Sequence, residues 1–264
     1  MKFALVNGQR REAKKGLSGI CVGCAQPMTP KCGHIKIKHW AHRGKRKCDP
    51  WWENETEWHR GWKSHFQIEW QEYVHQAEDG EKHIADVKTI KGWVLEFQHS
   101  AISSEERNSR NSFYKRLTWV VDGLRRKRDK SQFFESLREV ASINNSPLVR
   151  RIFIASENTL LKEWSNLNAP ILFDFGDETS LWCLFPAGLQ DRKYICEFSR
   201  AAFIQIHQDE TEKDIFQELL EKFQILFSDF NKRFDAQARQ QQNLRYTDPL
   251  AALSHQRWRY RRPL

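Results

Sequence analysis

Two carboxylates fall at positions that suit a divalent cation. Asp86 lies in the segment 83–87, and Glu96 lies in the segment 93–98, with a turn between them centred near Lys91. In an antiparallel hairpin with that turn the two residues face each other, with Cβ atoms about 5 Å apart. Carboxylates so close repel unless a cation lies between them, and Mg²⁺ or Mn²⁺ prefers such hard oxygen ligands. We therefore predict that Asp86 and Glu96 bind a catalytic metal.

A helix before this hairpin carries further reactive groups. Glu55, His59 and Lys63 are spaced i, i+4, i+8, which places them on one helical face. Gln98 shares one face of its strand with Glu96, because strand side chains alternate between faces. Together these groups suit metal-assisted hydrolysis, in which a metal-bound water attacks phosphorus. The alternatives are structural roles. His59 and Lys63 could form a solvent-exposed face of the helix, Asp86 could cap a turn, and Glu96 could be the partner in a buried ion pair.

Cysteine and histidine residues gather near the start of the chain, at Cys21, Cys24, Cys32, His39, His42 and Cys48. A structural zinc ion takes four sulfur or nitrogen ligands, which two short ligand pairs supply. In a reducing compartment such clustering favours metal over disulfides. We predict that Zn²⁺ is held by Cys21, Cys24, His42 and Cys48, with His39 as the alternate ligand. The competing interpretation is a small β-hairpin without a metal.

These motifs follow one another in a distinctive order: Cys21-x-x-Cys24, His39-Trp40-Ala41-His42, Glu55-x3-His59-x3-Lys63, His83-x-x-Asp86, Glu96-x-Gln98-x-Ser100 and Arg110-x3-Tyr114. In this ordered set, over about residues 20–125, the chain resembles the competence protein CoiA-like family within the PD-(D/E)xK nuclease superfamily. The resemblance implies a restriction-endonuclease-like core in which Asp86 and Glu96 bind the metal and Glu55 supports it. It also implies DNA hydrolysis in DNA uptake, recombination or foreign-DNA handling, with a recombination or defence protein as a partner.

One departure from the superfamily pattern concerns charge. The usual motif ends in Lys, whereas this chain has Gln98, which carries no charge to stabilise a transition state. We expect Lys63 or Lys88 to supply it. The alternative function is a catalytically inactive, DNA-binding accessory protein of recombination or transformation.

The elements that must position these groups indicate an α/β fold. The hydrophobic patterns predict helices over 54–70 and 104–115 and strands over 83–88, 93–98 and 117–121. We expect a mixed sheet flanked by helices. Later segments predict strands over 151–155, 171–175 and 180–185, and a long helix from 211. We predict an N-terminal zinc-binding β module (1–50), a nuclease core (51–146) and an α+β extension with a basic tail (147–264).

The positive net charge of the chain indicates the class of its binding partner. The chain has 43 Lys and Arg against 34 Asp and Glu, a net charge of +9, which favours nucleic acid, with DNA preferred. Near its end Arg alternates with aromatic residues, which suits phosphate contacts and base stacking; the alternative is a solvated tail. The residues expected to contact nucleic acid are Ser100, Arg110, Tyr114, Arg125, Arg126, Arg128, Arg257 and Arg259.

Membrane association is not expected from the sequence. No apolar run approaches the roughly 20 residues of a membrane helix. The apolar start is too short for a signal peptide, so we expect the cytoplasm. Cys183 and Cys196 stand alone in apolar surroundings, which predicts buried thiols.

Overall fold

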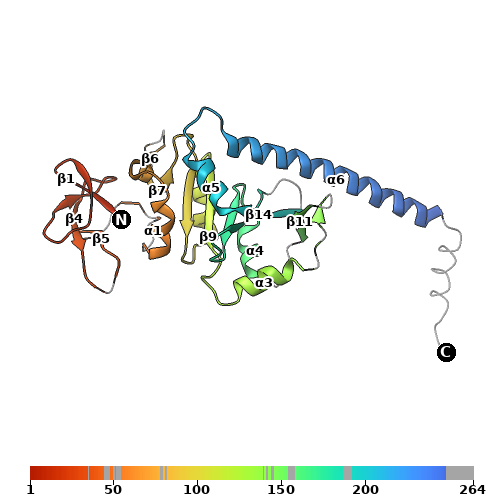
Figure 1. Ribbon diagram of the computed structural model, residues 1–264, viewed down its shortest axis with the longest axis horizontal. Helices are drawn as coiled ribbons and strands as arrows, with labels where there is room; N and C mark the ends of the chain where they lie inside the picture. Colours follow the sequence, from red (N-terminus) through yellow and green to blue (C-terminus); the bar gives the residue numbers. More distant parts are fainter. Residues whose placement is uncertain are drawn as a thin grey trace. The chain divides into compact units, whose positions relative to one another are not determined.

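The N-terminal segment folds into a five-stranded antiparallel sheet (Figure 1). Asn7 and Gly8 adopt positive φ of 52° and 78°, as a two-residue type I′ hairpin requires. Met28 and Trp40 are buried beneath the strands, with Cys21 beside them. The strands in spatial order are β2 (Gln9–Glu12), β1 (Phe3–Val6), β3 (Gly19–Ile20), β4 (Pro27–Lys31) and β5 (His39–His42).

A second sheet forms the body of the protein and has nine strands among the described residues. β8 and β12 both run parallel to β9, and the other pairings are antiparallel. All side chains of β8, β9 and β12 are buried, as expected of strands covered on both faces. In spatial order the strands are β10 (Ser142–Ile143), β11 (Ser146–Phe153), β14 (Arg192–Ser199), β13 (Ser180–Leu184), β12 (Ile171–Asp174), β9 (Leu117–Asp122), β8 (Val94–Gln98), β7 (Lys82–Lys88) and β6 (Gln71–Gln76).

Short helices connect and flank this sheet: α1 (Glu57–Ser64), the 3₁₀ helix η1 (Ile68–Trp70), α2 (Ser104–Phe113), α3 (Asp129–Ser136), α4 (Thr159–Trp164) and α5 (Arg200–Gln208). Side-chain caps define where several begin. Ser103 Oγ accepts from the Glu106 amide at 3.1 Å, and Asn158 Oδ1 accepts from the Leu161 amide at 2.9 Å. The mixed α/β class predicted from the sequence is confirmed.

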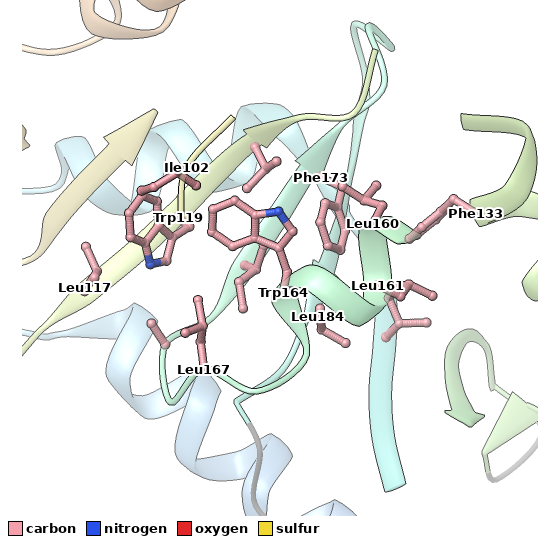
Figure 2. Packing of buried hydrophobic residues seen from close by; sticks show 14 of the residues in the cluster. Ile102, Leu117, Trp119, Phe133, Leu160, Leu161, Trp164, Leu167, Phe173 and Leu184 are labelled. Atoms are coloured by element: carbon pink, nitrogen blue, oxygen red, sulfur yellow. The ribbon is translucent and has the colours of Figure 1, made fainter. Parts of the chain in front are cut away.

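The main core lies between the sheet and α3 and α4 (Figure 2). Trp119 of β9 and Trp164 of α4 are fully buried, and their ring centroids lie 5.2 Å apart. Leu160, Leu161 and Phe173 complete the packing shown in Figure 2. This core holds β9 in place, and β9 in turn supports the strand that carries Glu96.

The chain divides into two compact units, Met1–Asp214 and Ile215–Leu264. The second contains α6 (Ile215–Thr247), which begins four residues after the start predicted for the long helix. Along it Phe223 and Phe227 stack with ring centroids 5.6 Å apart. Among the helices of the described residues, none combines the length and apolar character needed to cross a bilayer. The structure describes residues 1–34, 36–44, 48, 49, 51, 55–77, 80, 82–138, 140, 142, 143, 146–153, 158–186 and 192–247.

One sheet includes strands from both sides of residue 146, because β9, which precedes it, pairs with β12, which follows it. Two expectations about the elements need correction. The helix predicted over 54–70 is α1 followed by the separate η1. β6 and β14 were not predicted, and β6 pairs with β7 beside the hairpin that carries Asp86.

Candidate metal centre and active-site cavity

The N-terminal sheet brings together the four predicted zinc ligands. The ligand atoms of Cys21, Cys24, His42 and Cys48 all lie within 4.8 Å of one another. Cys21 Sγ is 3.6 Å from Cys48 Sγ, and Cys24 Sγ is 3.3 Å from His42 Nε2. Zn–S bonds of about 2.3 Å in a tetrahedron place sulfur atoms about 3.7 Å apart, which fits this spacing. The cluster is therefore suited to a zinc-like ion.

The local backbone favours this cluster. The Gly23 amide donates to Cys21 Sγ at 3.4 Å, and a Cβ on Gly23 would lie 3.3 Å from Cys48 Sγ. A hydrogen bond from the Cys48 thiol lowers the pKa of Cys21 to about 4, while burial opposes this shift. The thiolate is the form that binds metal. The glycine in the turn thus leaves room for the sulfur atoms to converge.

The other two candidates in this module lie outside the cluster. His39 Nδ1 donates to the Ile37 carbonyl at 2.8 Å, so this nitrogen is engaged locally. Cys32 is partly buried against the apolar core of the module. The structure thus selects His42 over the alternate ligand His39.

A second site is a cavity of about 70 Å³ lined by residues of α1, α2 and the strands β6, β7 and β8, and by Met1. Five carboxylate residues line it: Asp49, Glu55, Glu72, Asp86 and Glu96. His59, Lys63 and Arg110 also line it, so the acidic groups are opposed by two fixed cations and one imidazole. Five of the six residues predicted to be catalytic therefore meet at one cavity.

The hairpin of β7 and β8 has the register predicted from its turn. Val87 pairs with Leu95 and Lys88 with Val94, so the next position places Asp86 opposite Glu96. Asp86 Oδ2 also accepts a hydrogen bond from the Phe97 amide at 3.0 Å. The predicted juxtaposition of the two carboxylates is confirmed.

Lys63 lies at the centre of the acidic groups. Its Nζ is 2.8 Å from Glu55 Oε1, 3.5 Å from Glu72 Oε1 and 3.6 Å from Asp86 Oδ1. Burial alone would lower the pKa of Lys63, but the charges of Glu72, Asp86 and Glu55 raise it above its usual value. Burial likewise opposes ionisation of Glu55, yet Lys63 and Arg60 hold the pKa of that carboxyl at about 2. The ammonium therefore lies where three nearby carboxylates favour a positive charge.

Glu96 is paired with a buried arginine. Arg110 Nη1 donates to Glu96 Oε2 at 2.7 Å, and Arg110 Nη2 donates to the Trp51 carbonyl at 2.6 Å. Glu96 Oε1 is buried and has no hydrogen-bond partner within the described part of the chain. Burial raises the pKa of Glu96 to about 8, although Arg110 opposes the shift. One carboxylate oxygen thus remains available to a ligand in the cavity.

The remaining predicted catalytic groups separate into two places. His59 lines the cavity, and its Nδ1 is 2.9 Å from Thr56 Oγ1 within a capping box that starts α1. Gln98 Nε2 instead donates to the Ser100 carbonyl at 3.1 Å, and Gln98 is not among the cavity-lining residues of the described chain. Lys88 Nζ lies 4.5 Å from the centre of the Tyr73 ring. Of the two lysines considered for the missing charge, Lys63 is the one in the cavity.

Two acidic residues of the cavity were missed from the sequence. Asp49 Oδ1 accepts from His83 Nδ1 at 2.9 Å, and its Oδ2 accepts from the Ile84 amide at 2.7 Å. Its place directly after the candidate metal ligand Cys48 was a usable signal. Glu72 Oε2 accepts from the Phe3 amide at 3.0 Å, and its backbone φ is 45°. This contact joins β6 to the N-terminal strand, and no local pattern indicates it.

Two residues expected to contact nucleic acid are buried, which corrects that expectation. Arg110 is 6% exposed because it pairs with Glu96. Tyr114 is 3% exposed and packs against the rings of Trp51 and Phe113. Neither side chain is placed to meet a phosphate on the surface.

The other predicted contacts differ in their exposure. Arg125 and Arg126 both pair with Glu163, each at 2.9 Å. Ser100 and Arg128 are exposed. Arg257 and Arg259 lie outside the described residues. The ion pairs with Glu163 reduce the charge that this basic segment offers to a polyanion.

Comparison with known proteins adds no relative. No family model matches the chain, and neither a curated protein nor a solved structure matches it.

Proposed function

We propose that this chain is a divalent-metal-dependent nuclease of the CoiA-like type, which hydrolyses phosphodiester bonds of DNA. The observation that carries the proposal is the shared cavity. Asp86 and Glu96 reach it from adjacent strands, and His59 and Lys63 reach it from α1. Glu55 lies just before the N-cap Thr56 of α1, not on the helix as the sequence spacing predicted, and still lines the cavity. A carboxylate pair on a hairpin, packed beside a helix and a parallel strand pair, supports a restriction-endonuclease-like core.

The donor set of the cavity fits Mg²⁺ or Mn²⁺. Asp86 and Glu96 would hold the ion with support from Glu55, because carboxylate oxygens are the ligands these cations prefer. The unpaired Oε1 of Glu96 is free to bind it. When bound, the metal lowers the pKa of a water ligand and neutralises charge on the phosphoryl oxygens. The zinc-like ion of the Cys21 cluster has a structural role in this proposal.

The chain's own groups have distinct tasks. Lys63 supplies the positive charge that Gln98 lacks, because it lines the cavity beside Asp86. His59 is oriented by Thr56 and can hold or move a proton at the cavity wall. Arg110 keeps Glu96 in position through a buried ion pair. Asp49 fixes the start of β7 through the Ile84 amide.

The test is cleavage of labelled single- and double-stranded DNA with Mg²⁺ or Mn²⁺. Asp86→Asn and Glu96→Gln are the variants of choice, because Glu96→Ala would also remove the buried acceptor that Arg110 Nη1 contacts. We expect each to lower the cleavage rate about 100-fold or more, since several kcal/mol of charge stabilisation are lost. Glu163→Gln is the matched control, because Glu163 pairs with arginines outside the cavity. Equal cleavage by all variants would refute the proposal.

The accessory-protein alternative has one observation in its favour. Gln98 replaces the usual Lys and lies away from the cavity, while Lys63 is already bound by three carboxylates. Equal DNA affinity of the wild-type protein and the Glu96→Gln variant, with no cleavage of single- or double-stranded DNA by either, would support this alternative.

A further inference from the structure

Positive charge is concentrated in the N-terminal module. Residues 1–49 contain 12 Lys or Arg and 2 Asp or Glu, while the whole chain contains 43 and 34. Residues 50–264 therefore carry 31 basic and 32 acidic residues and are close to neutral. The basic character of the chain thus belongs to the segment that forms the five-stranded sheet and the Cys21 cluster.

Most of the described cations of this module are exposed and form no ion pair. Within the described part of the chain, none of the seven following residues forms an ion pair. They are Arg11, Lys14, Lys15, Lys31, Lys36, Lys38 and Arg43, and all are exposed. In the larger sheet region Arg107, Arg125 and Arg126 pair with Glu163, and Arg200 pairs with Asp174. Exposed cations without an ion pair are therefore more numerous in the module than in the basic segment after β9, where Arg125 and Arg126 are paired.

Four of these cations belong to the β4–β5 hairpin. Lys31 pairs with His39 across the hairpin, Lys36 and Lys38 lie in the connection, and Arg43 follows β5. Arg43 Nε donates to Thr29 Oγ1 at 3.0 Å, which directs it along β4. The same hairpin ends in His42, so a metal held by the Cys21 cluster would fix the strand that carries the charges.

The hairpin is also tied to the acidic cavity. Arg60 of α1 donates through Nη2 both to the Lys38 carbonyl and, at 3.1 Å, to Glu55 Oε2. Glu55 lines the cavity with Lys63 and Asp86. One arginine thus joins the backbone of the basic hairpin to the wall of the cavity, and in Figure 1 β5 and α1 are neighbours.

We propose that Lys31, Lys36, Lys38 and Arg43 form a docking surface for the phosphate backbone of DNA, which leads the strand toward the cavity. Lysine and arginine that neutralise phosphates release condensed counterions, so binding of this kind depends on salt and not on sequence. The inference rests on the proposed nuclease function for the role of the cavity. DNA binding itself is independent of that function.

The experiment measures binding of a labelled 20-base-pair duplex to the full, zinc-loaded chain by fluorescence anisotropy, without Mg²⁺ or Mn²⁺ so that no cleavage occurs. The variant Lys36→Ala/Lys38→Ala/Arg43→Ala is compared with Arg138→Ala/Lys162→Ala/Lys222→Ala. The control removes the same charge from exposed positions outside the module. Zinc content and far-ultraviolet circular dichroism show that both variants retain the fold.

For the module variant we expect at least a tenfold loss of affinity at 0.1 M salt. Its slope of log K against log salt should fall by about 2 to 3, since each phosphate contact contributes about 0.9. The control should keep wild-type affinity and slope. Absence of DNA binding by wild type, or an equal or greater loss in the control, would overturn the docking surface. Cleavage is assayed separately, so binding without cutting would refute only the nuclease.

Discussion

Lys63 illustrates how a single residue sets the electrostatics of the candidate site. A buried ammonium is costly unless charges of opposite sign surround it, and here three carboxylates do so within 3.6 Å. The same carboxylates would repel one another without it. Lys63 thus stabilises, in the metal-free protein, an arrangement of oxygens that also suits a divalent cation.

Replacing Lys63 tests this role. We expect Lys63→Met to lower the free energy of unfolding by about 3 to 5 kcal/mol, because it leaves buried carboxylates uncompensated. Addition of Mg²⁺ or Mn²⁺ should restore much of the loss, since the cation replaces the missing charge. Urea unfolding with and without the metal measures both effects. Arg107→Met, which breaks a buried ion pair outside the cavity, should be destabilised without metal rescue; rescue of neither or of both variants would contradict the prediction.

Residue types alone did not reveal which charges are available. Arg110 has the spacing and charge of a phosphate contact, but it is consumed by Glu96. That pair joins α2, which carries Arg110, to β8, which carries Glu96, and α2 is the connection between the parallel strands β8 and β9. The sequence predicted Arg110 as a nucleic-acid contact and did not indicate its pairing with Glu96, which lies on another element.

At the scale of elements, local geometry was predictable and non-local pairing was not. The β7–β8 hairpin has a short turn, so its register, and with it the placement of Asp86 opposite Glu96, follows from the sequence. β6 has the polar sequence QEYVHQ and forms the edge of the sheet. Its Glu72 reaches the cavity through a left-handed backbone conformation and bonds to β1. Such a contact depends on the packing of the two sheets, which periodicity does not report.

Helix α5 contains a buried histidine that should make stability depend on pH. His207 Nδ1 donates to the Phe203 carbonyl at 2.8 Å. Burial lowers the pKa of His207 to about 4 from 6.5, with Lys91 adding to the shift and Asp214 opposing it. The buried imidazole is therefore neutral, and the unfolded chain binds a proton more readily than the folded protein. Stability from this residue is present above pH 6.5 and is lost as pH falls from 6.5 through 4.

We expect the free energy of unfolding to decrease across this pH window by at most about 1.4 kcal/mol per pH unit from His207. His207→Asn keeps a donor near the Phe203 carbonyl but does not titrate. The difference in unfolding free energy between wild type and His207→Asn should therefore shift with pH between 6.5 and 4. Chemical denaturation at several pH values measures it, and a difference that stays constant would show that His207 is not buried in the neutral form.

At the scale of the whole first unit, hydrogen bonds connect the Cys21 cluster to the strand that lines the acidic cavity. Cys48 is a predicted ligand, and the next residue, Asp49, accepts hydrogen bonds from His83 and from the Ile84 amide at the start of β7. The connection continues along β7 to Asp86. A metal that fixes Cys48 should therefore also fix the strand that carries one of the two candidate metal-binding carboxylates.

Removal of the zinc-like ion tests this connection. We expect chelation, or Cys48→Ser, to speed hydrogen exchange of the Ile84 amide at least tenfold, because the Asp49 carboxylate loses its anchor and metal binding supplies folding energy to small modules. The Leu172 amide, in the core strand β12, should keep its protection. Cys32→Ser is the matched control, since Cys32 lies in the same module but outside the cluster. Native-state exchange followed by mass spectrometry or NMR provides the measurement. Unchanged exchange at Ile84 after metal loss would show that the metal does not stabilise β7 beside the cavity. Equal acceleration at Leu172 would indicate global destabilisation instead.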